Sequence, residues 1–247
     1  MIDPASIPVR AIEWRPSYRL IPSRYPTVGL YDAIADPADL DVVFAIEALT
    51  NSRVRDELGQ LQLVPPEHRV SGAGTTPIMA AFTHLNPEGS RFSDGSYGVY
   101  YATDSLEASV AEVGHHRGVF LSRTREPAVD IDLRLILADV DAGLHDLTGL
   151  RKKAPEIHLP DDYSAGKALG RALRKAGSAG VVYRSVRFDG GLCVGAFRPN
   201  VLGRAKAGAH IAMHWDGTAI THWYEKKAPH ALQSGLYPGA VLGLCYK

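Results

Sequence analysis

Arg91-Phe92-Ser93-Asp94-Gly95-Ser96-Tyr97-Gly98-Val99-Tyr100-Tyr101-Ala102 is the segment that says most about the fold. Its glycines and serines predict a turn, and the residues from about 98 to 103 predict a strand. The next residues predict a helix that carries Glu112. Arg91, Tyr101 and Glu112 at this spacing can bring an anion clamp, an aromatic platform and a carboxylate into one pocket.

Proline and capping residues predict where the helices begin. Asp36-Pro37 opens one that ends near Leu58-Gly59, and Thr76 caps another with Pro77 at its first position. The free N–H groups at the Thr76 end can hold an anion. A capping box predicts the start of the Glu112 helix at Asp104.

The remaining patterns predict strands near 18–21, 128–135, 180–183 and 192–197, a helix over 163–176 closed by Gly177, and a hairpin over 210–223 that turns at Asp216-Gly217. Residues before the first strand predict a looped lead-in rich in proline. Together the patterns predict a mixed α+β fold with a largely antiparallel sheet and flanking helices.

Composition limits the classes of protein that the chain can be. The 247 residues suggest one domain, 1–247, because no linker divides them. Lys plus Arg and Asp plus Glu both number 27, so no net charge attracts a nucleic acid. With two cysteines and neither a signal peptide nor a transmembrane run, we expect a cytoplasmic protein without a membrane partner.

Several familiar catalytic motifs are missing from the sequence. No G-x-G-x-x-G follows a strand, and neither G-x-x-x-x-G-K-[ST] nor G-x-S-x-G occurs. The ten histidines are scattered, and Glu112 to His115 has no second E-x-x-H to complete a dinuclear centre. We therefore expect no metal. Taken singly, Arg91, Tyr101 and Ser185 each have an ordinary structural explanation.

The segments Arg91 to His116 and Gly180 to Pro199 closely resemble the RES-domain family, named for its Arg, Glu and Ser, whose members are toxins of bacterial toxin–antitoxin pairs. The family's residues match here, in order and type, at Arg91, Tyr101, Glu112 and Ser185, and its early arginine matches Arg19. Tyr100 leaves open which tyrosine faces the pocket. The resemblance implies a core of about 18–199, a lead-in before it and the hairpin as a C-terminal extension.

The resemblance also implies a fold similar to ADP-ribosyltransferases and an enzyme that consumes NAD. Cleavage of the nicotinamide N-glycosidic bond, with phosphate or water as acceptor, would place Glu112 near the positive charge on the ribose. Arg19 and Arg91 would hold the pyrophosphate. Tyr101 would stack on nicotinamide or ribose, and Ser185 would bind the nicotinamide side or orient Glu112. No metal is required, and the Thr76 helix is expected as an additional pocket wall.

The implied partner is a cognate Xre-type antitoxin that covers the active site, and a homo-oligomer remains open. Two other functions stay possible on the same residues: a protein ADP-ribosyltransferase, and a module that binds NAD or ADP-ribose without turnover. A soluble α+β domain whose matching residues are incidental is the remaining alternative.

Overall fold

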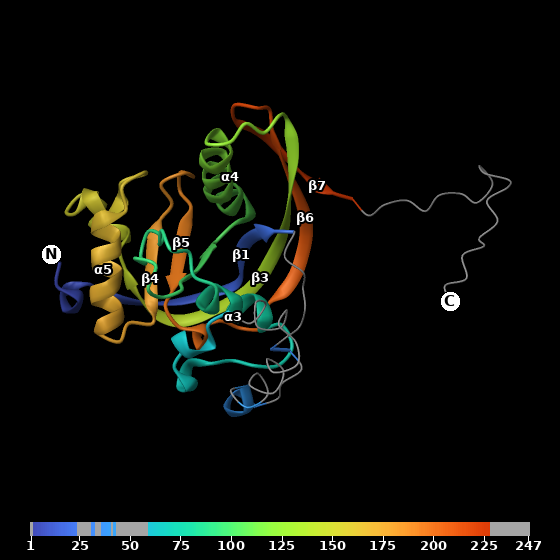
Figure 1. The fold of residues 1–247 in the computed structure, drawn as a ribbon. Coiled ribbons are helices and arrows are strands. Elements are labelled where there is room, and N and C mark those ends of the chain that lie inside the picture. Colours follow the sequence, from blue (N-terminus) through green and yellow to red (C-terminus); the bar gives the residue numbers. More distant parts are fainter. Residues whose placement is uncertain (1, 24–30, 33–35, 41, 43–58, 228–247) are drawn as a thin grey trace, which may run out of the picture.

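The computed structural model describes residues 2–23, 31–32, 36–40, 42 and 59–227. Its centre is one seven-stranded sheet in the order β1-β2-β5-β4-β3-β6-β7 (Figure 1). The strands are β1 (Val9–Pro22), β2 (Tyr100–Thr103), β3 (Val129–Asp146), β4 (Gly180–Arg184), β5 (Leu192–Ala196), β6 (Lys206–Trp215) and β7 (Ile220–Lys226). The helices are α3 (Thr76–Thr83), α4 (Leu106–Ser122) and α5 (Ser164–Lys175).

The strand pairings confirm the predicted mixed α+β fold with a largely antiparallel sheet. Within the described ranges, β3 and β4 form the parallel pair, and the other pairings are antiparallel. Strand β1 pairs with both β2 and β3, so β1, β2, β5, β4 and β3 close into a circuit. The hairpin β6–β7 extends the sheet from β3, where the sequence predicted a hairpin.

Strand β1 corrects the prediction of a looped lead-in with a short strand at 18–21. It runs for 14 residues and pairs with β3 on both sides of Pro16. The register shifts between Trp14 and Ser17, so the proline lies where the ladder is interrupted. Because proline has no N–H to donate, a strand tolerates it at such an irregularity.

The helices cover both faces of the sheet, with α4 and α5 on one side and α3 on the other (Figure 1). Helix α3 packs into a core that includes Tyr100 and Val140. Helix α5 packs against β4 and β5, and α4 packs against β1, β3 and β6. Because α4 and α5 lie on the same face of the sheet, side chains from the two helices can lie close together there.

Two helix starts differ in detail from the predictions, and a third agrees with its prediction. Thr75, not Thr76, caps α3, so Thr76 is its first residue. Ser105, not Asp104, caps α4, because Asp104 accepts a hydrogen bond from the backbone N of Leu192 instead. Asp36 does cap the turn Pro37–Asp39, and most of the helix predicted from there to 58 lies outside the described residues.

Helix α5 lies directly on the backbone of the Arg91 segment. Gly166 faces the carbonyl of Arg91, and Gly170, one turn later, faces the carbonyl of Phe92. A Cβ at either glycine would collide with that carbonyl oxygen. The two glycines thus fix the height of the Arg91 loop against α5.

Candidate active site

Glu112 and Ser185 form a direct hydrogen bond at the centre of the candidate site. The Ser185 hydroxyl donates to Oε1 of Glu112 over 2.6 Å. Its Oγ accepts from the backbone N of Arg187 at 3.1 Å and of Phe188 at 2.9 Å. Ser185 is 4% exposed. The turn after β4 therefore holds the serine, and the serine holds the carboxylate that α4 presents.

Cys193 on β5 also contacts this carboxylate. Its Sγ lies 3.7 Å from Oε1 of Glu112. Burial, and then the negative charge of Glu112, raise the pKa of the thiol well above its ordinary value. The sulfur is therefore a neutral neighbour of Glu112 rather than a thiolate nucleophile.

Tyr101 and Tyr100 project to opposite faces of β2. The phenol of Tyr101 hydrogen-bonds the Ser90 hydroxyl at 2.8 Å and accepts from the backbone N of Phe92 at 2.9 Å. Burial raises the pKa of Tyr101 to about 12, so the phenol stays neutral. Tyr100 is fully buried in the core with α3, and among the described residues its hydroxyl has no partner. Tyr101 is thus the tyrosine that belongs to the Arg91 loop.

Arg91 is a nearly buried cation that has no carboxylate partner among the residues described. It is 7% exposed, and its Nη1 donates to the carbonyls of Ile157 at 3.2 Å and Leu159 at 2.8 Å. Its guanidinium lies 4.4 Å from the centre of the Tyr163 ring. No ion pair to Arg91 occurs within the described part of the chain. Neutral groups hold the arginine in place and leave its charge uncompensated.

Arg19 is a second such cation, and it comes from β1. Its Nη1 donates to the backbone carbonyl of Tyr101 at 2.9 Å, and its guanidinium lies 4.6 Å from the Tyr100 ring centre. Its Nε is buried and finds no hydrogen-bond partner in the described residues. Burial lowers its pKa. Arg19 thus lies beside the main chain of Tyr101, on the Tyr100 side of β2.

Two side chains connect Glu112 with the Arg91 loop. Tyr183 interacts electrostatically with Glu112, Tyr101 and Arg91, and its ring meets Phe92 edge-on at 5.0 Å. His116 interacts electrostatically with both Glu112 and Arg91. The structure therefore brings Arg91, Tyr101, Glu112 and Ser185 into one region between α4 and α5.

Sequence reasoning missed several of these neighbours. His116 lies one helical turn after Glu112, a spacing that puts the two on one face of α4 and could have signalled it. Arg187 hydrogen-bonds the Pro160 carbonyl and the Asp161 carboxylate, and its Nε is buried without a partner in the described residues. No sequence signal marks Tyr163 as the partner of Arg91, because a loop brings it there.

Thr76 does not join this group. Its backbone N and its hydroxyl both donate to Oδ1 of Asp32, at 3.1 and 2.8 Å. The backbone N of Thr75 donates to the same oxygen at 3.1 Å. The carboxylate of Asp32 therefore already occupies the start of α3, where the sequence predicted an anion site.

The described ranges contain neither a metal-binding cluster nor a membrane-spanning helix. No three His, Cys, Asp or Glu side chains come together there as a group that could hold a metal ion. None of the helices found in those ranges has the length and apolar character to cross a membrane.

The fold is of the mixed α+β class. The RES-domain family model matches residues 66–216, and the chain belongs to that family. Uncharacterized protein y4oC of Sinorhizobium fredii is 31% identical over 207 residues, which cover 84% of this chain and 86% of that protein. A chain in the crystal structure of the M. tuberculosis MbcT–MbcA toxin–antitoxin complex is 17% identical, with a TM-score of 0.45, over 83% of this chain and 90% of that one.

Proposed function

We propose that this chain is a toxin that cleaves the N-glycosidic bond between nicotinamide and ribose in NAD, with phosphate or water as the acceptor. The observation that carries the proposal is the Glu112 carboxylate, held at 2.6 Å by Ser185, one helical turn before His116, whose ring lies 6.4 Å from the Tyr163 ring that Arg91 contacts. Membership of the RES-domain family supports the same reading.

Glu112 suits the chemistry of this bond. As nicotinamide departs, positive charge develops on the ribose carbon that it leaves, and a fixed carboxylate stabilises that charge. The Ser185 hydroxyl and the two backbone N–H groups behind it keep the carboxylate from turning away. Acceptor attack on the same carbon then completes the exchange.

Arg91 suits the diphosphate of the substrate, and Arg19 would reach it from the Tyr100 side of β2. Arg91 and Arg19 are each held by carbonyls and aromatic rings, so their charge stays available for an anion. Guanidinium groups match phosphate oxygens through paired hydrogen bonds, which a lysine cannot form. The buried Nε of Arg19, which has no partner in the described residues, is one donor that a ligand would satisfy.

The proposal extends to the setting in which the toxin works. We infer a cytoplasmic protein whose pocket a cognate Xre-type antitoxin covers, on the strength of the family resemblance. Co-expression with the antitoxin should restore growth and should block NAD loss in the purified complex. A complex that consumes NAD as fast as the free toxin would contradict an antitoxin that covers the pocket.

Mass spectrometry of NAD incubated with the purified protein tests the reaction. Phosphorolysis gives nicotinamide and phosphorylated ADP-ribose only when phosphate is present, whereas hydrolysis gives free ADP-ribose with or without it. Glu112→Gln should lower the rate about 100-fold or more, since it removes the charge that stabilises the transition state. Glu107→Gln, on an exposed position of the same helix, is the matched control.

Two results would contradict the proposal. NAD that stays intact, while a mass shift appears on a protein, would indicate protein ADP-ribosylation. Binding of NAD without release of nicotinamide under any acceptor would indicate a non-catalytic module. In cells, Glu112→Gln should abolish toxicity while Glu107→Gln retains it.

A further inference from the structure

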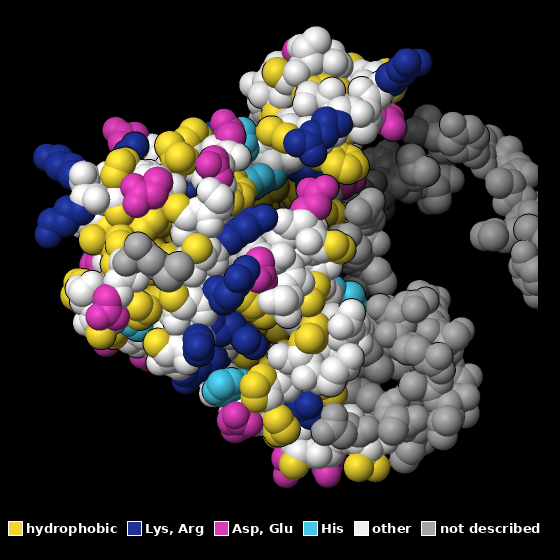
Figure 2. All heavy atoms as spheres, turned by 60° about the vertical axis from the view of Figure 1, so that its left-hand side comes forward, with side chains coloured by type: hydrophobic (Ala, Val, Ile, Leu, Met, Phe, Trp, Pro, Cys, Tyr) yellow, Lys and Arg dark blue, Asp and Glu magenta, His cyan; other side chains and the backbone are white. Residues whose placement is uncertain are grey.

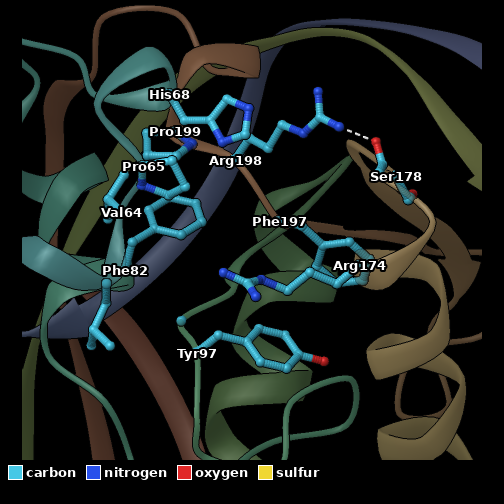
Figure 3. Close-up of a pocket in the computed structure, with 13 residues that line it drawn as sticks. Val64, Pro65, His68, Phe82, Tyr97, Arg174, Ser178, Phe197, Arg198 and Pro199 are labelled. Carbon is cyan, nitrogen blue, oxygen red and sulfur yellow. Dashed lines mark hydrogen bonds between the residues drawn. The ribbon is translucent and has the colours of Figure 1, made fainter.

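A second cavity lies at the far end of α5, with a volume of about 200 Å³ (Figure 3). It forms where the end of α5 meets the segment after β5, α3 and the short turns between 61 and 68. Its basic lining consists of His68, Arg174 and Arg198. Its aromatic lining consists of Phe82, Tyr97 and Phe197.

The two arginines of this cavity have no carboxylate partner among the described residues. Arg174 lies 4.7 Å from the centre of the Tyr97 ring, and Arg198 donates to the carbonyl of Gly177. Neither arginine takes part in an ion pair in the ranges that the structure describes. His68 interacts electrostatically with both of them, and also with the exposed Glu67. The cavity is therefore positive.

The aromatic residues give the same cavity a flat apolar wall. Phe82, Tyr97 and Phe197 are 3%, 5% and 5% exposed, so packing holds their rings in place. Figure 3 shows the Arg174 side chain reaching toward the space that Phe82 and His68 face. Cationic groups and ring faces thus border one small volume.

The cavity is separate from the Glu112 site. Tyr163, the ring partner of Arg91, directly precedes α5, and Arg174 follows eleven positions later near the end of the helix. At the helical rise per residue, the two positions are about 16 Å apart along the axis. Figure 2 shows a band of lysine and arginine side chains across the face that the α5 side presents. An anion approaching this face meets positive charge before it reaches either site.

We propose that this cavity binds a small phosphate ester that carries a planar ring, of the mononucleotide class. Arg174 would take the phosphate, since guanidinium groups pair with phosphate oxygens, and Arg198, which is bonded to the Gly177 carbonyl, would add positive charge at the rim. The ring would pack against Phe82 and Phe197. The cavity is below the usual 300–1,000 Å³ of drug-sized sites, so part of a bound mononucleotide would stay in solvent.

Isothermal titration calorimetry tests the site with adenosine monophosphate as the probe. The probe should bind the intact chain, and both adenosine and inorganic phosphate should bind at least about tenfold more weakly, because each lacks one half of the recognised structure. Arg174→Gln should weaken the probe about tenfold or more, in line with charge-assisted hydrogen bonds. Lys175→Gln, exposed on the same helix and outside the cavity lining, should leave it unchanged.

The Glu112 site could also attract the probe, so Arg91→Gln is measured in parallel. Arg91→Gln should leave the binding constant within about twofold, a difference smaller than one hydrogen bond. Loss of binding in Arg91→Gln with full binding in Arg174→Gln would overturn the proposal. So would no heat with the probe at millimolar concentration, or equal binding of inorganic phosphate. If Arg174→Gln unfolds, Arg198→Gln takes its place, and it should weaken the probe in the same direction.

Discussion

Ser185 acts on Glu112, and through Glu112 on any bound substrate. We expect Ser185→Ala to lower kcat for nicotinamide release roughly 10- to 100-fold, because the carboxylate loses one charge-assisted hydrogen bond that orients it. KM should change little. Steady-state kinetics measure both constants. Ser122→Ala, which removes an exposed hydroxyl from the same helix, is the control. An unchanged kcat would mean that the backbone alone positions Glu112.

Tyr100 and Tyr101 offer a matched pair of substitutions. Tyr101→Phe removes the partner of the Phe92 backbone N, and a buried donor left unpaired costs about 1–3 kcal/mol of unfolding free energy. Tyr100→Phe removes a hydroxyl without a partner in the described residues, so it should be neutral or stabilising. Urea unfolding of both variants measures the difference. Equal destabilisation would contradict the assignment of Tyr101 to the Arg91 loop.

For single residues, the sequence indicates which side chains could carry the chemistry, but it does not indicate which residues those side chains contact. Glu112 and Ser185 lie on a regular helix and at a strand end, and the family pattern located both. Tyr163 reaches Arg91 only through the fold of residues 147–163, whose turns have no periodicity to read. Thr76 had a sound local signal for an anion site, but Asp32, 44 residues earlier, supplies the anion.

Helix α5 and helix α4 should respond oppositely to the same substitution. Gly170→Ala would press a methyl group into the Phe92 carbonyl, so we expect a loss of about 1–3 kcal/mol and a displaced Arg91 loop. Gly118→Ala on α4 would meet Ile220 at an ordinary 3.8 Å, and should gain about 0.5–1 kcal/mol through helix propensity. Thermal unfolding of both variants measures the two changes in stability. A stabilised Gly170→Ala would show that α5 can move away from the loop.

Helices and strands with a regular pattern of apolar residues were predictable from the sequence, but the full length of strand β1 was not. The α5 pattern ended at Gly177, which has the positive φ of 78° expected of a helix stop. For β1 the sequence predicts a strand of only four residues, because Pro16 and Pro22 count against a strand. Its partner β3 was likewise read too short, because its second half, paired with β1, lacks a simple alternation. Both strands are longer than predicted because they pair with each other, and this pairing cannot be seen in either segment alone.

Across the whole molecule, acid should weaken the fold well before its carboxylates titrate. Burial is the leading cause of a lowered pKa at five histidines, namely His68, His115, His116, His145 and His158. In the unfolded chain they regain the ordinary pKa of about 6.5, so that chain binds more protons. The unfolding free energy should therefore fall as the pH drops from 7 to 5. It should stay level above 7.

Urea midpoints between pH 5 and 7.5 measure this dependence. His158 is 6% exposed, and its Nε2 is buried without a partner in the described residues, so it should contribute most clearly. His158→Gln should flatten the curve, and His210→Gln, at an exposed position, should not. A curve that is flat in the parent would exclude the buried histidines as its cause.

The circuit of strands has a consequence for how the protein is made. Arg19 leaves the ribosome with β1, but its strand pairs with β3, and Ser185 follows more than 160 residues after Arg19. Contacts between such distant segments form slowly and late. A nascent chain therefore carries Arg91 and Glu112 for some time before β4 and Ser185 reach them. If the proposed reaction is correct, the nascent chain cannot cleave NAD until β4 has left the ribosome.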